Sequence, residues 1–350
     1  MGRPVSIQDI ARAAGVSHST VSRALRDSSL ISAEVRGRIQ QLAVEMGYTP
    51  NAIAQSLQTN RTHSIGLVVS TVGDPFWADV VRGVEQVAQT AGLSVLLSAA
   101  HRDPDLEIRV IENFHRRRVD GILVADSRMN EAAAARLART QIPTVVLNSQ
   151  AESALGLLSN VSIDDQAGAR MAVEHLLGLG HRAIGYIGLG NRPRSNTLRL
   201  TGYREALNAA NIPLRKQWEV IAPDEDELIE DDVAAGEALT YPLINSGVSA
   251  ICCYNDMVAI GVLLACRNLR INIPRQLSVI GFDDLPTVQY VTPPLTTIRQ
   301  PRVELGQCAM QTLVNLIEGQ QGASQTANQT ILPSLVIRES CAPPLHRELR

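Results

Sequence analysis

The feature that most constrains the fold of this chain is an alternation of short apolar runs with longer helical patterns, starting near residue 64. The first series of apolar runs lies at 64–69, 93–98, 120–125 and 143–148, and the second at 183–188, 249–254 and 277–282. Helical patterns such as FWADVVRGVEQVAQTAG lie between them. Strands that alternate with helices predict doubly wound parallel α/β sheets, covered on both faces. Two series predict two such subdomains.

The N-terminal segment follows a different, purely helical pattern. A stripe at helical spacing consists of Ile7, Ile10, Ala11 and Ala14. Ser6 precedes it as an N-cap, and Asp9 three positions on completes a variant of the capping box. Gly15 then suits a tight turn, and Ser17 caps a second helix.

The second helix has little to bury and a polar outer face. Val21, Ala24 and Leu25 face inward, and a third helix expected over 32–46 closes a small core. Two short helices joined by a glycine turn predict a helix-turn-helix whose second helix enters the major groove of DNA. A solvated helix in a small bundle is the alternative. The residues expected at the DNA are Ser17, His18, Ser19, Thr20, Ser22, Arg23 and Arg26.

Charge and composition agree with this division. The chain of 350 residues has a formal net charge of −3; residues 1–62 carry seven arginines against four acidic residues, or +3, which leaves −6 for the remainder. A basic head on an acidic body favours a nucleic-acid contact at one end, although +3 could also be compositional noise. The five cysteines form no C-x-x-C pair, and neither a secretory signal nor a membrane-spanning run is visible. We therefore expect reduced thiols, no metal centre and a cytoplasmic location.

Several separate motifs carry a family resemblance. In chain order they are IQDIARAAGVSHSTVSRAL, GYTPNAIAQSLQTNRTHSIGLVV, NDMVAIG, SVIGFDDL and PPLTTIRQP. With these motifs the chain resembles the lactose/galactose repressor (LacI/GalR) family of bacterial transcription regulators over nearly its whole length. The resemblance implies a DNA-binding domain at 1–48, a hinge helix and linker at 49–62, a two-lobed periplasmic-binding-protein-like core at 63–340, and a short tail at 341–350. The lobes would be joined by crossings near 162, 292 and 322.

The resemblance also implies that residues 50–58 fold into a helix on operator DNA. In this family the residue that matches Leu57 is wedged into the minor groove and kinks the duplex. Gln55 and Gln58 stand where many relatives carry Arg or Lys, which predicts a shallower salt dependence of binding. The hinge residues expected at the DNA are Asn51, Ala54 and Leu57.

Polar and aromatic residues follow the predicted strands, at the edge where open α/β sheets bind ligands. The resemblance places several of them in a cleft between the lobes. From the residues alone, Phe76 could equally be core and Asp283 could cap a helix. Asn148 departs from the Asp often found there, which leaves the charge of the ligand open. The residues expected at the ligand are Phe76, Trp77, Asp126, Asn148, Ser195, Arg199, Asn255 and Asp283.

Other patterns indicate no additional chemistry. The stretch IGLGN at 187–191 lacks the third glycine of a dinucleotide fingerprint, and the acidic run at 223–232 lacks the glycine and ligand spacing of an EF-hand. That run is expected to be a solvated loop, and His175 and His181 are expected to be structural. No nucleophile motif is present, so an enzyme is not expected.

The combined prediction is a homodimeric repressor that binds a pseudo-palindromic operator. The C-terminus RESCAPPLHRELR leaves no room for a leucine heptad, which favours a dimer over a tetramer. The family-matched set Asn148, Arg199, Asn255 and Asp283 beside Phe76 contains only one cation and one carboxylate, and a phosphorylated ligand would want more positive charge than that. We therefore expect a neutral saccharide as the ligand, and we expect it to release the DNA. The alternatives are a purine corepressor, which aromatic residues on both lobes would favour, and a solute-binding protein. Aromatic residues are assigned only to the first lobe, around 76–77. No cofactor is expected.

Overall fold

The computed structural model describes residues 5–48, 61–140, 142–150, 157–223, 231–319 and 327–345. The chain divides into two compact units, Met1–Thr62 and His63–Arg350, which are considered separately. The predicted hinge residues Asn51, Ala54 and Leu57 lie outside the described residues. No helix of the described part is long and apolar enough to cross a membrane.

The N-terminal unit is a three-helix domain built as the sequence predicts. Its helices are α1 (Ile7–Ala14), α2 (His18–Ala24) and α3 (Ala33–Glu45). Ser6 and Asp9 form a capping box at the start of α1, and Gly15 ends that helix at φ 68°. Ile10, Val21 and Ile39 are fully or almost fully buried where the three helices meet. This small core fixes the angle between α1 and α2.

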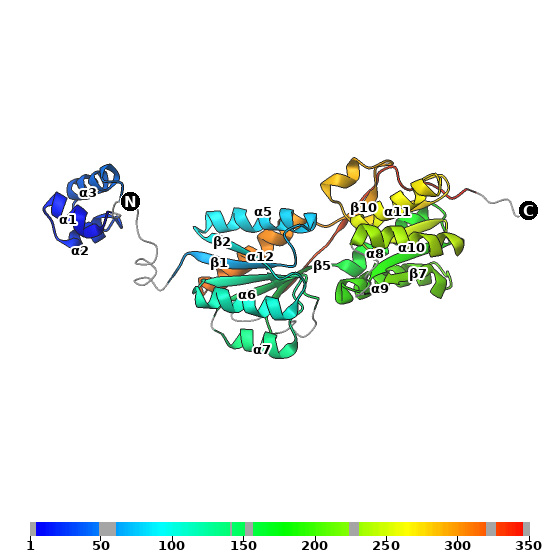
Figure 1. The fold of residues 1–350 in the computed structure, drawn as a ribbon, viewed down its shortest axis with the longest axis horizontal. Helices are drawn as coiled ribbons and strands as arrows, with labels where there is room; N and C mark the ends of the chain where they lie inside the picture. The colour runs from blue at the N-terminus through cyan, green and yellow to red at the C-terminus, as the bar shows by residue number, and fades with distance from the viewer. Residues whose placement is uncertain are drawn as a thin grey trace, which may run out of the picture. The chain divides into compact units, whose positions relative to one another are not determined.

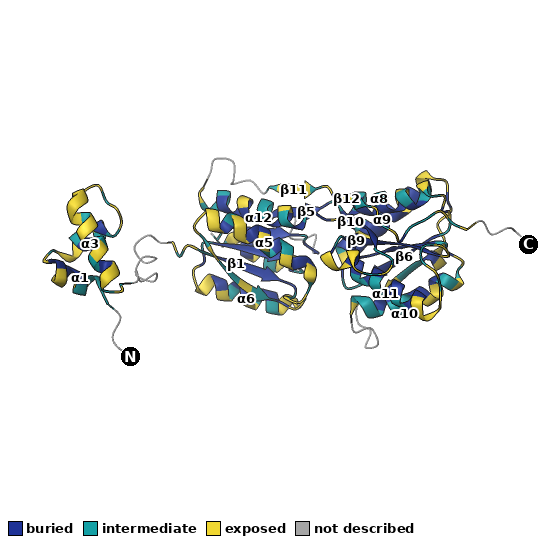
Figure 2. Cartoon of the chain, turned by 90° about the horizontal axis from the view of Figure 1, so that it is seen from above, coloured by how far each residue is buried: buried dark blue, intermediate teal, exposed yellow. Residues whose placement is uncertain are grey.

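The first lobe of the larger unit is a six-stranded parallel sheet (Figure 1). Its strand order is β11 (Asn328–Ile331), β5 (Ser159–Ile163), β4 (Thr144–Leu147), β3 (Gly121–Ala125), β1 (Ser64–Val69) and β2 (Ser94–Ala99). One face is covered by α5 (Pro75–Thr90) and α12 (Arg302–Ile317), and the other by α6 (Pro104–Arg116) and α7 (Glu131–Arg139). The central strands are therefore apolar on both faces, and Figure 2 shows them as buried.

The second lobe repeats this architecture, with one antiparallel edge. Its strand order is β12 (Ser334–Val336), β10 (Thr296–Arg299), β9 (Ser278–Asp283), β8 (Ala250–Cys253), β6 (Ile184–Leu189) and β7 (Glu219–Ala222). The covering helices are α8 (Asp165–Gly178), α9 (Pro193–Ala209), α10 (Asp232–Asn245) and α11 (Asp256–Asn268), with short 3₁₀ turns η2 (Lys216–Trp218) and η3 (Pro286–Gln289). The doubly wound parallel architecture predicted from the sequence is confirmed, and β12, which runs antiparallel to β10, is the one departure among the described strands. The chain enters β12 directly from β11 of the first lobe, so β12 runs through the second sheet in the direction opposite to its other strands.

The chain passes between the lobes three times, and two of these crossings lie later than expected. The first follows β5 at Asp164, close to the expected position 162. The second lies between β10 and α12, after Arg299, because residues 296–299 pair with β9 of the second lobe. The third lies at 332–333, because residues 328–331 still belong to the first lobe, where they form β11 beside β5. The expected position 322 lies outside the described residues.

Candidate functional site

The outer face of α2 carries the polar side chains that the sequence assigns to DNA. His18, Ser19 and Arg23 are exposed on it. Ser17 caps the helix by accepting from the Thr20 amide, and its hydroxyl lies 2.8 Å from that of Ser19. This N-cap fixes the first turn of the helix, which is the part that meets base edges in a major-groove reader.

Two further members of this face bond to each other. Arg26 donates from Nε to the backbone oxygen of Ser22 at 3.1 Å and from Nη2 to the Ser22 hydroxyl. Arg26 therefore lies along the helix axis. Arg23 has no such side-chain bond among those the structure records within this unit, so its guanidinium is left to reach outward.

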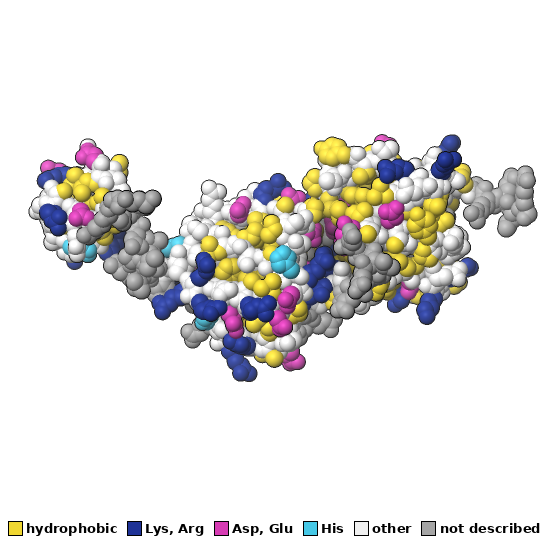
Figure 3. Space-filling view, in the orientation of Figure 1, with side chains coloured by type: hydrophobic (Ala, Val, Ile, Leu, Met, Phe, Trp, Pro, Cys, Tyr) yellow, Lys and Arg dark blue, Asp and Glu magenta, His cyan; other side chains and the backbone are white. Residues whose placement is uncertain are grey.

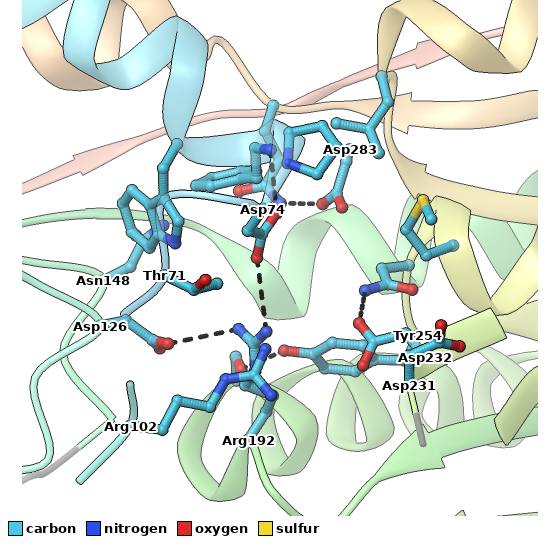
Figure 4. Close-up of a pocket in the computed structure, with 18 of the residues that line it drawn as sticks. Thr71, Asp74, Arg102, Asp126, Asn148, Arg192, Asp231, Asp232, Tyr254 and Asp283 are labelled. Atoms are coloured by element: carbon cyan, nitrogen blue, oxygen red, sulfur yellow. Dashed lines mark hydrogen bonds and ion pairs between the residues drawn. The ribbon is translucent and has the colours of Figure 1, made fainter. Parts of the chain in front are cut away.

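The larger unit contains a cleft of about 260 Å³ between its lobes, at the carboxyl ends of strands from both sheets (Figure 4). This volume is near the small end of ligand pockets, which are roughly 300–1,000 Å³. All eight residues expected at the ligand lie on its lining. The polar and aromatic lining comprises Thr71, Asp74, Phe76, Trp77, Arg102, Asp126, Asn148 and Gln150 from the first lobe and Asp165, Arg192, Ser195, Arg199, Asp231, Asp232, Tyr254, Asn255, Asp283 and Gln300 from the second lobe and its crossing.

The start of α5 supplies the aromatic wall of the first lobe. Asp74 caps the helix by accepting from the Phe76 amide at 3.0 Å. The rings of Phe76 and Trp77 meet edge to face with centroids 4.9 Å apart. The Trp77 indole donates to Ser70 at 2.9 Å and is buried, so its orientation is fixed from below. Phe76 therefore sits on a rigid support, as a ligand-stacking ring requires.

Arg199 is tightly held within the second lobe. Its Nε donates to Asp165 at 2.8 Å, Nη1 donates to the carbonyl of Tyr254, and the guanidinium lies 4.3 Å from the Tyr254 ring centroid and 3.8 Å from that of Phe282. Burial raises the pKa of Asp165, and the charge of Arg199 opposes this. The predicted ligand residue Arg199 is thus also half of a buried ion pair.

Arg192 links the lobes at the opposite wall of the cleft. Its guanidinium lies 3.4 Å from Asp126 and 3.6 Å from Asp74, both of the first lobe. Arg102 lies beside it (Figure 4), and burial, followed by the charge of Arg192, lowers the pKa of Arg102. The Nε atoms of Arg102 and Arg192 are buried without a hydrogen-bond partner among the described residues.

These contacts correct two premises of the sequence-based interpretation. Three arginines and six aspartates line the cleft, instead of one cation and one carboxylate. Tyr254 also brings an aromatic ring from the second lobe, so the aromatic residues are not confined to 76–77. Tyr254 directly follows β8 and Arg102 follows β2, so a complete reading of the strand ends would have included both.

The remaining predicted residues combine cleft exposure with structural bonds. Asn148 accepts from the amide of Ile163 at 3.0 Å. Asn255 caps α11 and donates to Asp232 at 2.7 Å. Ser195 lies 2.7 Å from the Tyr254 hydroxyl and also donates to Gln150. Bonds within the protein thus fix the directions of these side chains, which is the preorganisation that a binding site needs.

Asp283 stands at the end of β9 in a buried setting. Its carboxylate accepts from Gln300 at 2.5 Å. Burial raises the pKa of Asp283 to about 7, against the opposing charge of Arg199. Burial also raises the pKa of the neighbouring Asp256, and the charge of Asp283 adds to this. Asp283 does not cap a helix, because the turn after it is the short η3 and its cap is Leu285.

Two minor expectations have mixed outcomes. His181 is structural, since its ring nitrogens bond to Ser249 and Ser278. The acidic run is not simply a solvated loop, because Asp231 caps α10 and both Asp231 and Asp232 line the cleft. Residues 224–230 of that run lie outside the described part. No group of side chains suited to a metal ion occurs in the part of the chain that the structure describes.

Comparisons with known proteins agree with this architecture. Residues 6–51 match the bacterial regulatory proteins of the lacI family, and residues 173–341 match a periplasmic binding protein-like domain. The chain is 34% identical to the HTH-type transcriptional regulator GalS of Salmonella typhimurium, over 97% of each chain. It is 30% identical to the HTH-type transcriptional repressor PurR of Haemophilus influenzae, over 96% of this chain and 98% of that protein. A lac repressor dimer bound to operator and the anti-inducer ONPF superposes with a TM-score of 0.85 at 27% identity, covering 97% of this chain and all of that chain.

A helix-turn-helix domain followed by a two-lobed α/β core therefore defines this chain as a DNA-binding transcriptional regulator and not an enzyme. More specifically, it belongs to the LacI family of transcriptional regulators.

Proposed function

We propose that this regulator is a homodimeric repressor that a small neutral saccharide releases from a pseudo-palindromic operator in the cytoplasm. Two copies of the N-terminal domain would occupy successive major grooves. His18, Ser19 and Arg23 would read bases, with Ser17, Thr20, Ser22 and Arg26 supporting them. The hinge at 49–62, with Asn51, Ala54 and Leu57 at the minor groove, would follow the family pattern.

The charge of the cleft supports a neutral ligand. Its lining contains six carboxyl groups and three guanidinium groups, and two of the latter pair with carboxylates of the lining. A phosphorylated or carboxylated ligand would meet this excess of carboxyl groups and be repelled. Interleaved donors and acceptors beside the Phe76 ring suit the hydroxyls and the apolar face of a sugar. This mixed polar lining is the observation that carries the proposal.

A purine that promotes operator binding is the second candidate. Tyr254 favours it, because its ring lines the cleft from the lobe opposite Phe76. One face of that ring is already covered by Arg199 at 4.3 Å, which reduces the area left for stacking a base. The saccharide therefore remains the better fit.

The proposed dimer has support from an apolar surface of the second lobe. Figure 3 shows hydrophobic side chains gathered around α10, α11 and β10. A groove of about 540 Å³ lies beside α11. Its apolar lining comprises Ile260, Leu263, Leu264, Ile271, Ile273 and Val291. Surfaces of this kind on a protein that reads two-fold symmetric DNA suit an isologous contact with a second copy.

The deciding experiment starts by selecting an operator from random DNA with the full-length chain. Thermal shift is then measured against monosaccharides, disaccharides and purine bases, each with and without the selected DNA. Because a ligand of the folded state raises the melting temperature, a saccharide should do so and should weaken the gel shift. Stabilisation by a purine, with a tighter gel shift, would establish the second candidate instead.

A further inference from the structure

The side chain of Arg302 joins the two lobes through five hydrogen bonds. It stands at the first residue of α12, directly after the second crossing, and is 7% exposed. Its Nη1 donates to the backbone oxygens of Asp283 and Asp284, the latter at 3.1 Å, and Nη2 also reaches the Asp284 oxygen at 3.1 Å. On its other side, Nε and Nη2 donate to the Asp79 carboxylate at 3.1 and 2.7 Å. One guanidinium thus joins α5 of the first lobe to the end of β9 in the second.

The two residues whose backbone oxygens accept from Arg302 have an unusual backbone conformation. Asp283 has φ 126° and Asp284 has φ 55°, in the left-handed region that residues with a side chain adopt rarely. Such a conformation is strained and persists only where surrounding contacts impose it. The Arg302 bonds to both carbonyls are contacts of that kind. This backbone shape turns the Asp283 carboxylate into the cleft (Figure 4).

The first-lobe end of the link is rigid. Asp79 lies one turn after Phe76 on α5, the helix whose start forms the aromatic wall of the cleft. Helices α5 and α12 approach closely, because a Cβ at Gly83 would lie 2.1 Å from the Val303 oxygen. Asp79 and Arg302 therefore belong to one tightly packed helix pair. A relative movement of the lobes must change the bonds between this pair and residues 283–284.

We propose that Arg302 is a positioning residue that holds Asp283 in its cleft-facing conformation and couples that conformation to α5. The ligand role of Asp283 rests on the proposed function; the mechanical coupling does not. Ligand contacts at Asp283 and at Phe76 would then respond to a single arrangement of the lobes. This provides a direct path from the cleft to the lobe that follows the hinge segment.

Hydrogen exchange followed by mass spectrometry tests this on the full-length chain. Arg302→Met should speed exchange at residues 283–285 and at 75–82 at least about ten-fold relative to α9, which serves as the internal reference for overall stability. Arg299→Met is the matched control. The Arg299 side chain donates to the Asp284 carboxylate and has no recorded bond to Asp79 or to the two carbonyls, so segment 75–82 should be unchanged.

A second variant, Asp79→Asn, separates coupling from simple local packing. It keeps Arg302 and the shape of the side chain at position 79 but removes the charge of Asp79, which pairs with both Arg302 and Arg82. Faster exchange at 283–285 in Asp79→Asn is the expected result, because the disturbance must pass through Arg302. The proposal would be overturned if exchange at 283–285 were unchanged in Asp79→Asn. It would also be overturned if Arg302→Met and Arg299→Met changed the exchange rate at 75–82 equally. Operator binding is measured on the same samples, so a failure of the repressor function is recognised separately.

Discussion

Among single residues, Arg23 has the proposed role in DNA recognition that a substitution tests most directly. It is exposed on α2, whereas Arg26 is bonded back to its own helix. A bidentate contact from arginine to a guanine contributes about 1–3 kcal/mol of discrimination. Arg23→Ala should therefore lose that amount on the selected operator and little on random DNA, as measured by competition gel shift. Equal losses on both DNAs would identify Arg23 as a phosphate contact.

Substitution of Arg199 should reduce the stability of the fold, because Arg199 forms a buried ion pair with Asp165. Such a variant is therefore not a clean test of ligand binding. Removing one partner of a buried pair costs about 3–5 kcal/mol, because the other charge stays buried and unpaired. Arg199→Met should destabilise the chain by this amount in urea denaturation. The double variant Arg199→Met with Asp165→Asn should recover most of the loss. If the two substitutions are simply additive, the pair does not stabilise the fold as proposed here.

The Asp283 carboxyl predicts a pH dependence of stability. Burial raises its pKa from 3.8 to about 7, so the folded chain holds a proton that the unfolded chain has released above about pH 4. Through this group the free energy of unfolding falls as the pH rises from about 4 to about 7. Asp283→Asn removes this contribution, so its melting temperature should rise relative to wild type across that window. A difference between the two proteins that is constant with pH would contradict the assigned cause.

At the scale of secondary-structure elements, the α5–α12 pair depends on close backbone approach. A Cβ at Gly306 would lie 2.1 Å from the backbone oxygen of Val80, where no flexible side chain can yield. Gly306→Ala should lower the free energy of unfolding by about 1–3 kcal/mol, because the helices must separate. Gly178→Ala is the control, since a Cβ there would meet no atom within 4 Å beyond its own helix and chain neighbours, and it should be neutral or slightly stabilising. Urea denaturation of both variants checks the comparison.

The elements that sequence patterns predict well are those with a strong apolar signature. Strands such as β1 and β3 are buried on both faces, so their runs of branched apolar residues stand out from the helices. Strand β11 has no such apolar run, because residues 328–330 of its sequence NQTI are exposed. Its pairing with β5 depends on the crossing of the chain, which no local pattern records. The third crossing was misplaced for that reason.

The sequence predicts where the cleft lies, but it does not predict which of its side chains bond to one another. Reading strand ends finds Asn148, Asn255 and Asp283, since parallel strands bring their carboxyl ends to one edge. It does not reveal that Arg199 is paired with Asp165, or that Arg192 faces Asp126 across the lobes. Those pairings depend on how two separate sheets are packed against each other, and they change both the charge of the site and the choice of test variants.

At the scale of the whole molecule, the proposed repressor requires coupling between the cleft and the operator. Such coupling typically amounts to about 1–3 kcal/mol, or roughly 5–150-fold in affinity, and it is reciprocal. If a saccharide weakens operator binding, the operator must weaken saccharide binding by the same factor. Calorimetry of a saccharide found by thermal shift, with and without saturating operator, measures both affinities.

Asp283→Ala is a suitable variant for testing the coupling between saccharide and operator. Asp283 lines the cleft but is not half of a buried ion pair such as Arg199–Asp165. It should bind operator with wild-type affinity and remain on the DNA when the saccharide is added. Asp105→Ala, an exposed carboxylate on α6, is the control and should respond like wild type. A tighter complex with the saccharide when operator is present would reverse the sign of the coupling. The small molecule would then be a corepressor. If operator increases the affinity for the ligand, the ligand must by reciprocity increase the affinity for operator.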